Sequence, residues 1–137
     1  MTSRHHVTVI VRPGGAAVVT LLALASAISV ARGEGDPAKG NAAFVRQCAL
    51  CHTIARGAPN SYGPNLFGIV GHRAASVAGY KYSRAFAASA QWNWSPDVLG
   101  AWISDPAAMI PGSTMDVFQG VADSDRDDIV AYLANQR

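Results

Sequence analysis

Cysteine is scarce in this chain of 137 residues, because Cys48 and Cys51 are the only two. A zinc site needs a second pair of ligands, and the sequence offers none at the usual spacing. A redox dithiol with this spacing should follow a strand of a βαβ unit, but the surrounding sequence is typical of helix and loop. The two cysteines therefore call for a different chemistry.

A strong charge of either sign is also missing. The chain has 11 basic and 9 acidic side chains, and Lys39 and Lys81 are its only lysines. Arg4 and Arg12 lie in an N-terminal segment that we expect to be removed, which leaves nine basic side chains against nine acidic ones. With no basic run, no repeat and no nucleic-acid motif, nothing favours nucleic acid as a partner. Steering toward a strongly acidic protein should be weak.

Residues 1–31 read as a leader. A basic start is followed by an uncharged run over 16–31, and small residues suit cleavage after Ala27 or after Ala31. The alternative is an uncleaved anchor, because the run approaches the roughly 20 residues that span a bilayer. We expect a cleaved signal peptide, a flexible linker at 32–35 and one domain over 36–137.

The sequence Cys48-Ala49-Leu50-Cys51-His52 is typical of covalent haem attachment. Each thiol can add across one haem vinyl group to form a thioether, which holds His52 within reach of the iron. We therefore predict one haem c, attached through Cys48 and Cys51, with His52 as a ligand and no disulfide. Export fits this chemistry, since haem is attached to thiols outside the bacterial cytosol.

The rest of the domain is predicted to be helical and free of strands. A helix should begin at Pro37 and run to the cysteine motif, and a short one should cover 83–90. Ser95-Pro96 should begin another, which Pro106 ends, and the last should begin near Asp123. The segment 107–115 is expected to be a loop.

Two further residues could serve the metal. Pro64 has a backbone carbonyl but no N–H, so it can only accept a hydrogen bond, for example from His52. Met115 follows a Pro-Gly turn, and its thioether is a soft ligand that suits haem iron opposite a histidine. Methionines are usually core residues, as we expect for Met109; the cysteine motif favours Met115 as a ligand.

These pieces, taken in order, resemble class I cytochrome c. The resemblance covers about 35–137 and rests on Gly40 and Phe44, 48–52, 63–66, 79–82, Trp94, 111–115 and 128–133. It implies an all-α fold of three to five helices around one haem, with His52 and Met115 as axial ligands. The residues alone predict Tyr132 or Leu133 opposite Gly40 and Phe44, and the resemblance implies that the terminal helices cross at Gly40, Phe44 and Tyr132. It also implies that the haem propionates are held by Tyr82, Trp94 and Ser113.

The chain departs from this family in three places. His72 stands where many relatives have an arginine near a propionate, with Arg73 beside it, so either could serve. Trp102 stands where relatives often have a tyrosine that bonds the methionine sulfur. One extra residue separates Met115 from Phe118, which puts the cover of the haem edge in doubt.

The resemblance implies a periplasmic one-electron carrier that is not an enzyme. Its partners would be redox proteins, such as a membrane oxidase, a reductase or a cytochrome complex. It should be a monomer that meets the membrane only through those partners unless the leader is kept. Two alternatives stay open: a haem protein with a labile Met115 that binds small ligands or reacts with peroxide, and a membrane-tethered relay.

Overall fold

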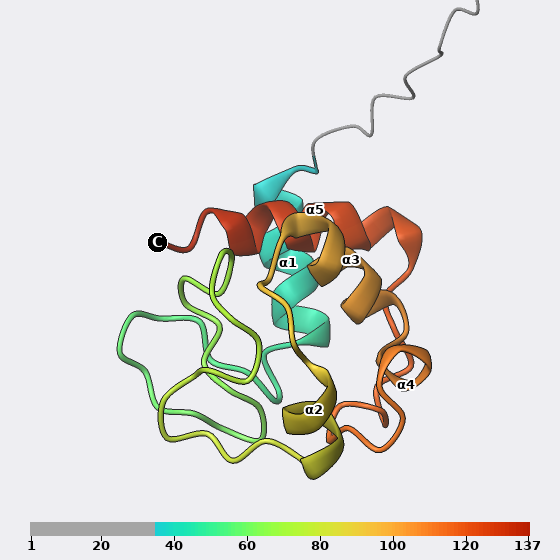
Figure 1. The fold of residues 1–137 in the computed structure, drawn as a ribbon. Helices are drawn as coiled ribbons and strands as arrows, with labels where there is room; N and C mark the ends of the chain where they lie inside the picture. Colours follow the sequence, from blue (N-terminus) through green and yellow to red (C-terminus); the bar gives the residue numbers. More distant parts are fainter. Residues whose placement is uncertain (1–34) are drawn as a thin grey trace, which may run out of the picture. The chain divides into compact units, whose positions relative to one another are not determined.

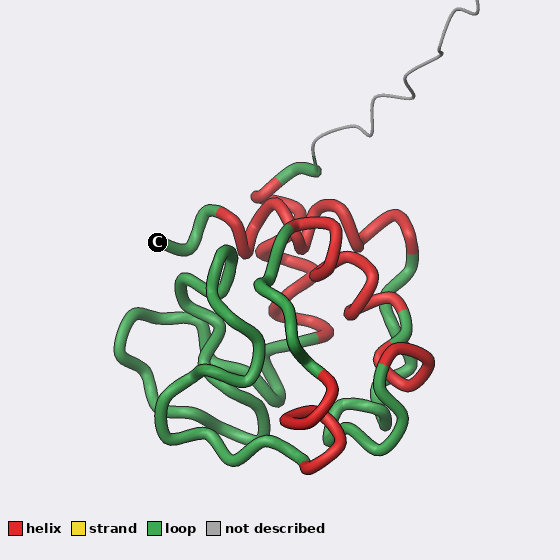
Figure 2. Tube along the Cα trace, viewed as in Figure 1, coloured by secondary structure: helices red, strands yellow, loops and turns green. Residues whose placement is uncertain are grey.

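The computed structural model describes residues 35–137, which form the domain in Figure 1. The predicted leader, its cleavage site and most of the linker lie outside the described residues. The domain consists of five helices joined by long loops: α1 (Pro37–Gln47), α2 (Arg84–Ser89), α3 (Pro96–Ser104), α4 (Pro106–Met109) and α5 (Asp123–Ala134). Figure 2 draws all the described residues as helix or loop. Arg73 and Asn93 form an isolated β-bridge that does not extend into a strand. The all-α prediction is confirmed for this part of the chain.

Two of the three longer helices, α1 and α3, begin where the sequence places their caps, whereas α5 begins at Asp123 without a side-chain cap. The carboxylate of Asp36 accepts hydrogen bonds from the N–H groups of Ala38 and Lys39, at 2.9 and 3.3 Å, and Pro37 occupies the first turn of α1. At α3, the hydroxyl of Ser95 accepts from the N–H of Val98 at 3.2 Å. Such caps satisfy backbone donors that a helix start would otherwise leave unpaired.

The helix α4 corrects our prediction of a loop from residue 107 onward. Pro106 does end α3, but it also occupies the first turn of a new four-residue helix. The carboxylate of Asp105 accepts from the N–H of Ala108 at 2.8 Å and so caps it. The same Asp-Pro pair that closes one helix therefore opens the next.

The first and last helices cross at a glycine. A Cβ on Gly40 would lie 2.7 Å from the Cβ of Tyr132 and would overlap the carbonyl of Asp128. The rings of Phe44 and Tyr132 pack with centroids 5.5 Å apart. Of the two residues predicted to face Gly40 and Phe44, Tyr132 is the one that does, and the crossing is as close as only a glycine permits.

The core lies between these helices and α3. Leu99, Trp102 and Ile103 are buried on α3, and Ile129 and Leu133 are buried on α5. Loops between Cys48 and Ser83 close the side of the domain away from α3, as Figure 1 shows. None of the helices in residues 35–137 is long and apolar enough to span a bilayer.

Candidate haem-binding site

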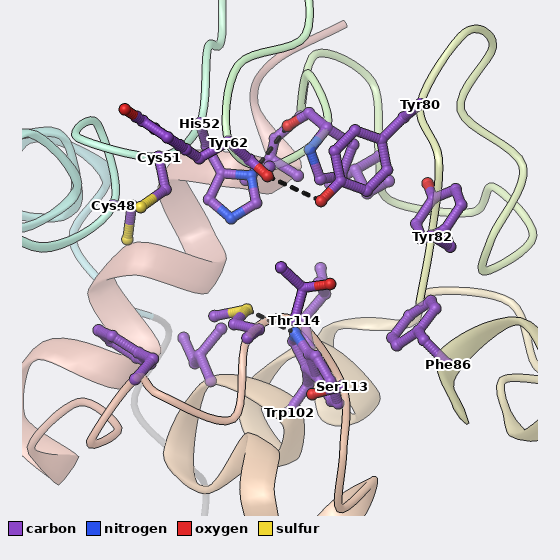
Figure 3. Close-up of a pocket in the computed structure, with 18 of the residues that line it drawn as sticks. Cys48, Cys51, His52, Tyr62, Tyr80, Tyr82, Phe86, Trp102, Ser113 and Thr114 are labelled. Atoms are coloured by element: carbon purple, nitrogen blue, oxygen red, sulfur yellow. Dashed lines mark hydrogen bonds between the residues drawn. The ribbon is translucent and has the colours of Figure 1, made fainter. Parts of the chain in front are cut away.

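A cavity of about 350 Å³ lies between the loops that follow the cysteine motif and the segment that contains α3 and Met115. In Figure 3, the cysteine motif and the tyrosines of the loops lie on one wall, and Trp102, Ser113 and Thr114 lie on the other. Every residue that we predicted for the site lines this cavity: Cys48, Cys51, His52, Pro64, Tyr82, Trp94, Ser113 and Met115. Most of the remaining lining is aliphatic or aromatic, as in sites for large organic cofactors.

The cysteine motif begins where α1 ends. Cys48 is the C-cap of α1, and the chain then turns so that the N–H of His52 donates to the carbonyl of Cys48 at 2.9 Å. This turn brings both sulfur atoms and the imidazole to one wall of the cavity, as Figure 3 shows. Burial, together with the neighbouring Cys51, raises the pKa of the Cys48 thiol to about 11. The thiol is therefore neutral at pH 7.

The ring of His52 is fixed from two sides. Its Nδ1 lies 2.8 Å from the carbonyl oxygen of Pro64, which can only accept, so Nδ1 carries the proton and donates. In the neutral ring, Nε2 then keeps the lone pair that a metal needs. Burial lowers the pKa of His52, and the hydrogen bond to Pro64 opposes this in part. A Cβ on Gly63 would come within 2.6 Å of Nδ1, so the backbone of Gly63 lies directly against the ring.

A network of hydrogen bonds holds the loop that carries Pro64. The side-chain amide of Asn65 donates to the hydroxyl of Thr53 at 2.8 Å and to the carbonyl of Ala55 at 3.0 Å. The N–H of Gly63 donates to the carbonyl of Cys51 at 2.7 Å. The loop after His52 is therefore ordered, as its glycine and proline content predicted, and the acceptor for His52 is held by its neighbours.

Met115 reaches the cavity from the opposite wall. Gly112 adopts a left-handed φ of 78°, and its N–H donates to the carboxylate of Asp116 at 2.9 Å, which closes the turn. The indole N–H of Trp102 donates to the sulfur of Met115 at 3.1 Å. Met109 does not line the cavity; it is half-buried and packs against the core. The two methionines thus differ in position as the sequence predicted.

Two aromatic residues that the sequence did not single out pack in this region: Phe86, which lines the cavity, and Trp92, which lies behind Trp94 and does not line it. Phe86, on α2, contacts the rings of Tyr82, Trp94 and Trp102 with centroids 5.1 to 6.3 Å apart. Trp92 packs edge-on against Trp94 at 5.8 Å. The signal for Phe86 was its position as the one aromatic residue among alanines and serines in the predicted helix 83–90.

Polar atoms are few in this lining, and one of them lacks a partner. The hydroxyl of Ser113 is buried and makes no hydrogen bond within the described residues. The hydroxyl of Tyr82 accepts from the N–H of Val77 at 3.3 Å, and burial is the main cause that raises its pKa. Buried polar groups normally find a partner. An apolar cavity with an unpaired hydroxyl fits a large flat group that carries polar substituents, as haem does.

Two of the departures from the family can be located relative to the cavity. Neither His72 nor Arg73 lines the cavity; both are exposed, and Arg73 donates to the side chain of Gln91 at 2.6 Å. After Met115, both Val117 and Phe118 line the cavity, but Val117 is 80% exposed whereas Phe118 is half-buried. Val117 is therefore turned outward, and Phe118 packs against the core.

Comparisons with known proteins agree with this architecture. The family described as cytochrome c matches residues 37–137. A cytochrome c of Theileria annulata is 45% identical over 101 residues, which are 73% of this chain and 85% of that protein. A cytochrome c2 of Agrobacterium tumefaciens is 41% identical over 73% of this chain and 91% of its own length. The solved structure of cytochrome cH from Methylobacterium extorquens is 40% identical, with a TM-score of 0.65, and the match covers 72% of this chain and 97% of that one. The fold and the relatives together place this chain in the cytochrome c family, as a class I electron-transfer protein rather than an enzyme.

Proposed function

We propose that this protein is a periplasmic one-electron carrier with one haem c, held covalently by Cys48 and Cys51 and ligated by His52 and Met115. The observation that carries the proposal is that these four side chains line one apolar cavity. Met115 is hydrogen-bonded to Trp102, which lies on the wall facing the cysteine motif in Figure 3. A histidine and a methionine are a ligand pair of electron-carrying haem. With both iron positions filled by protein, little rearrangement is needed when an electron arrives or leaves.

Bound haem supplies an iron that exchanges one electron at a time, and the chain supplies everything else. His52 presents Nε2 because Pro64 holds Nδ1. Met115 presents its sulfur, with Trp102 as its hydrogen-bond donor. The apolar lining excludes water, which favours the reduced, less charged state and raises the potential.

The polar substituents of the haem would be held by Tyr82, Trp94 and Ser113. The unpaired hydroxyl of Ser113 supports this role, because an ionised propionate is the partner that it lacks. The raised pKa of Tyr82 keeps its hydroxyl protonated, so that it can donate. Since neither His72 nor Arg73 lines the cavity, we assign no propionate contact to either of them.

The sequence and the relatives support a periplasmic setting. The leader at 1–31 supports export, and relatives include cytochromes c2 of bacteria. The protein would act as a monomer between membrane-bound redox complexes, such as an oxidase and a reductase.

Spectroscopy of the exported protein tests the proposal. We expect a low-spin haem spectrum that acid acetone does not extract, and a weak methionine-to-iron band in the oxidised form. A haem that acid acetone removes would refute the attachment. A high-spin spectrum that changes on addition of small ligands would favour the alternative with a labile Met115, and N-terminal sequencing would show whether the leader is kept as a tether.

A further inference from the structure

The peptide group that bonds to His52 is held at both ends. The carbonyl oxygen of Pro64 lies 2.8 Å from Nδ1 of His52 and accepts a hydrogen bond from it. The N–H of Asn65, which belongs to the same peptide group, donates to Oδ1 of Asn60 at 2.9 Å. The peptide group between Pro64 and Asn65 therefore connects the imidazole to the side chain of Asn60.

The side chain of Asn60 continues these hydrogen bonds to a second loop. Its Nδ2 donates to the carbonyl of Ala78 at 3.0 Å, whereas its Oδ1 accepts from Asn65. Only this orientation of the amide serves both partners, since a carbonyl can only accept and a backbone N–H can only donate. Asn60 is half-buried, so water has limited access to compete for these bonds.

The three hydrogen bonds point in one direction. His52 donates to the peptide group, the peptide group donates to Asn60, and Asn60 donates to Ala78. An amide that donates through its N–H becomes more polar, and its oxygen becomes a better acceptor. Hydrogen bonds in such a series strengthen one another, by roughly 10 to 30% for each bond. The bond at Nδ1 of His52 should therefore be stronger than a bond to an isolated carbonyl.

We propose that Asn60 is a positioning residue that tunes the iron ligand His52 through the peptide group between Pro64 and Asn65. A stronger acceptor at Nδ1 makes Nε2 a more basic donor to the metal. A more basic ligand favours the ferric state and so lowers the reduction potential. Asn60 does not line the cavity, so it acts on the site through these bonds. The inference rests on the proposed function, because it requires His52 to ligate the haem.

Two substitutions of Asn60 separate this electronic effect from a loss of structure. Asn60→Ala and Asn60→Asp both remove the donor to Ala78, but the aspartate keeps an oxygen that accepts from the N–H of Asn65. A charge-assisted hydrogen bond is roughly twice as strong as a neutral one, so the aspartate should polarise the peptide group more than the native amide does. The two variants should therefore change the His52 bond in opposite directions, whereas a purely structural role would change it in the same direction.

Proton NMR of the reduced, haem-loaded protein observes the Nδ1–H of His52 directly. Its resonance should move upfield in Asn60→Ala, because the bond to Pro64 weakens, and downfield in Asn60→Asp. The amide proton of Asn65 should exchange with solvent about fivefold faster in Asn60→Ala, as one lost hydrogen bond predicts, and no faster in Asn60→Asp. Shifts of the same sign in both variants, or no shift in either, would overturn the inference. If Asn60→Ala does not fold, the presence or absence of the downfield shift in Asn60→Asp decides.

A redox titration and a matched control complete the test. At a fixed applied potential, Asn60→Ala should about double the ratio of ferrous to ferric protein. Asn60→Asp should lower this ratio, but its added charge has the same effect, so for this variant the resonance decides. Tyr80→Phe is the control, because the hydroxyl of Tyr80 donates to the carbonyl of Tyr62 at 2.8 Å and so joins the same two loops without bonding to the peptide group. It keeps the aromatic ring and should leave the Nδ1–H resonance in place. An equal shift in Tyr80→Phe would show that contact between the loops, and not the peptide group, sets the His52 bond.

Failure of the proposed function would look different. A bound haem shifts the protons of its axial histidine through the ring current of the porphyrin. If the Nδ1–H of His52 lacks this shift in the unmodified protein, His52 is not a ligand, and both the proposed function and this inference are refuted. If the proton has the shift but does not respond to either substitution of Asn60, the inference alone is refuted.

Discussion

The indole N–H of Trp102 donates to the sulfur of Met115 at 3.1 Å and so ties α3 to the loop that follows α4. An indole donates but cannot accept, so this bond has one direction, whereas a hydroxyl at the same position could also accept. Phe86 packs edge-on against Trp102 with centroids 5.1 Å apart. The donor is therefore held in place by its own packing.

Replacing Trp102 by phenylalanine should lower the reduction potential. The hydrogen bond withdraws electron density from the sulfur and favours the ferrous state, and a neutral bond of this kind is worth about 1 kcal/mol. A redox titration measures the shift, and the methionine-to-iron band should also be lost at a lower pH. Phe86→Leu is the control, because it loosens the same packing without removing the donor. An equal shift in potential in both variants would show that packing, and not the hydrogen bond, sets the potential.

Met115→Ala should keep haem attached, because Cys48 and Cys51 are unchanged, but should open one iron position and lower the potential. Met109→Ala should retain the methionine-to-iron band and cost about 2 kcal/mol of stability, the lower end for methionine truncation, since Met109 is only half-buried. Visible spectra and denaturant unfolding distinguish the two. Loss of the band in Met109→Ala would reverse our assignment of the ligand.

Gly63→Ala should displace the imidazole of His52. The added Cβ would lie 2.6 Å from Nδ1, so the ring must move away from the carbonyl of Pro64. The altered ligation should appear in the electron paramagnetic resonance spectrum of the oxidised protein. Gly57→Ala, in the same loop, has open space around the added methyl and a left-handed φ of 73°. It should cost about 1 kcal/mol through that conformation and leave the spectrum unchanged. An unchanged spectrum in Gly63→Ala would refute the role of Gly63.

Gly40→Ala should weaken the crossing of α1 and α5. Its Cβ has no room beside Tyr132 and Asp128, and overpacking of this kind typically costs 1 to 3 kcal/mol or more, so we expect about 3 kcal/mol. Guanidinium unfolding of the haem-loaded protein measures the loss. Asn41→Ala is the neighbouring control; Asn41 is exposed on α1 and alanine is the better helix former, so its stability should not fall. A neutral Gly40→Ala would mean that the helices can separate without cost.

Tyr82 should make the protein less stable at high pH. Burial raises its pKa in the folded state above the value of 10.0 that applies when it is exposed. The unfolded chain therefore releases the proton first, so stability falls as pH rises from about 10 through the folded-state pKa. Tyr82→Phe should show a smaller loss in unfolding experiments between pH 9 and about 11. An identical pH profile in the two proteins would show that the hydroxyl is not shielded.

Local chemistry made the helix starts predictable. Asp36-Pro37 and Ser95-Pro96 each place a capping side chain before a proline, and both helices begin there. The cysteine motif was singled out for a related reason, because a Cys-x-x-Cys-His sequence has few other uses, and the motif in turn favoured Met115 over Met109 as a ligand. Gly40 was informative because a glycine inside a helix costs stability unless a neighbour comes close.

Contacts between distant segments were harder to predict. Nothing local shows that the indole of Trp102 reaches Met115, since the bond depends on how α3 packs beside the loop. The site role of Phe86 depends on α2 folding back onto Trp94 and Trp102.

The aromatic packing beside the cavity has a spectroscopic consequence. The three tryptophans of the chain, Trp92, Trp94 and Trp102, lie in one cluster, with neighbouring centroids 5.8 and 6.1 Å apart. Bound haem would quench their fluorescence by energy transfer, so emission would report the opening of this cluster alone. The crossing of α1 and α5 contains Phe44 and Tyr132 but no tryptophan. Far-ultraviolet circular dichroism reports all the helices and is weighted toward α1 and α5, which are the two longest. Unfolding curves from the two methods coincide only if both regions open together, which makes this pair of signals a direct measure of cooperativity.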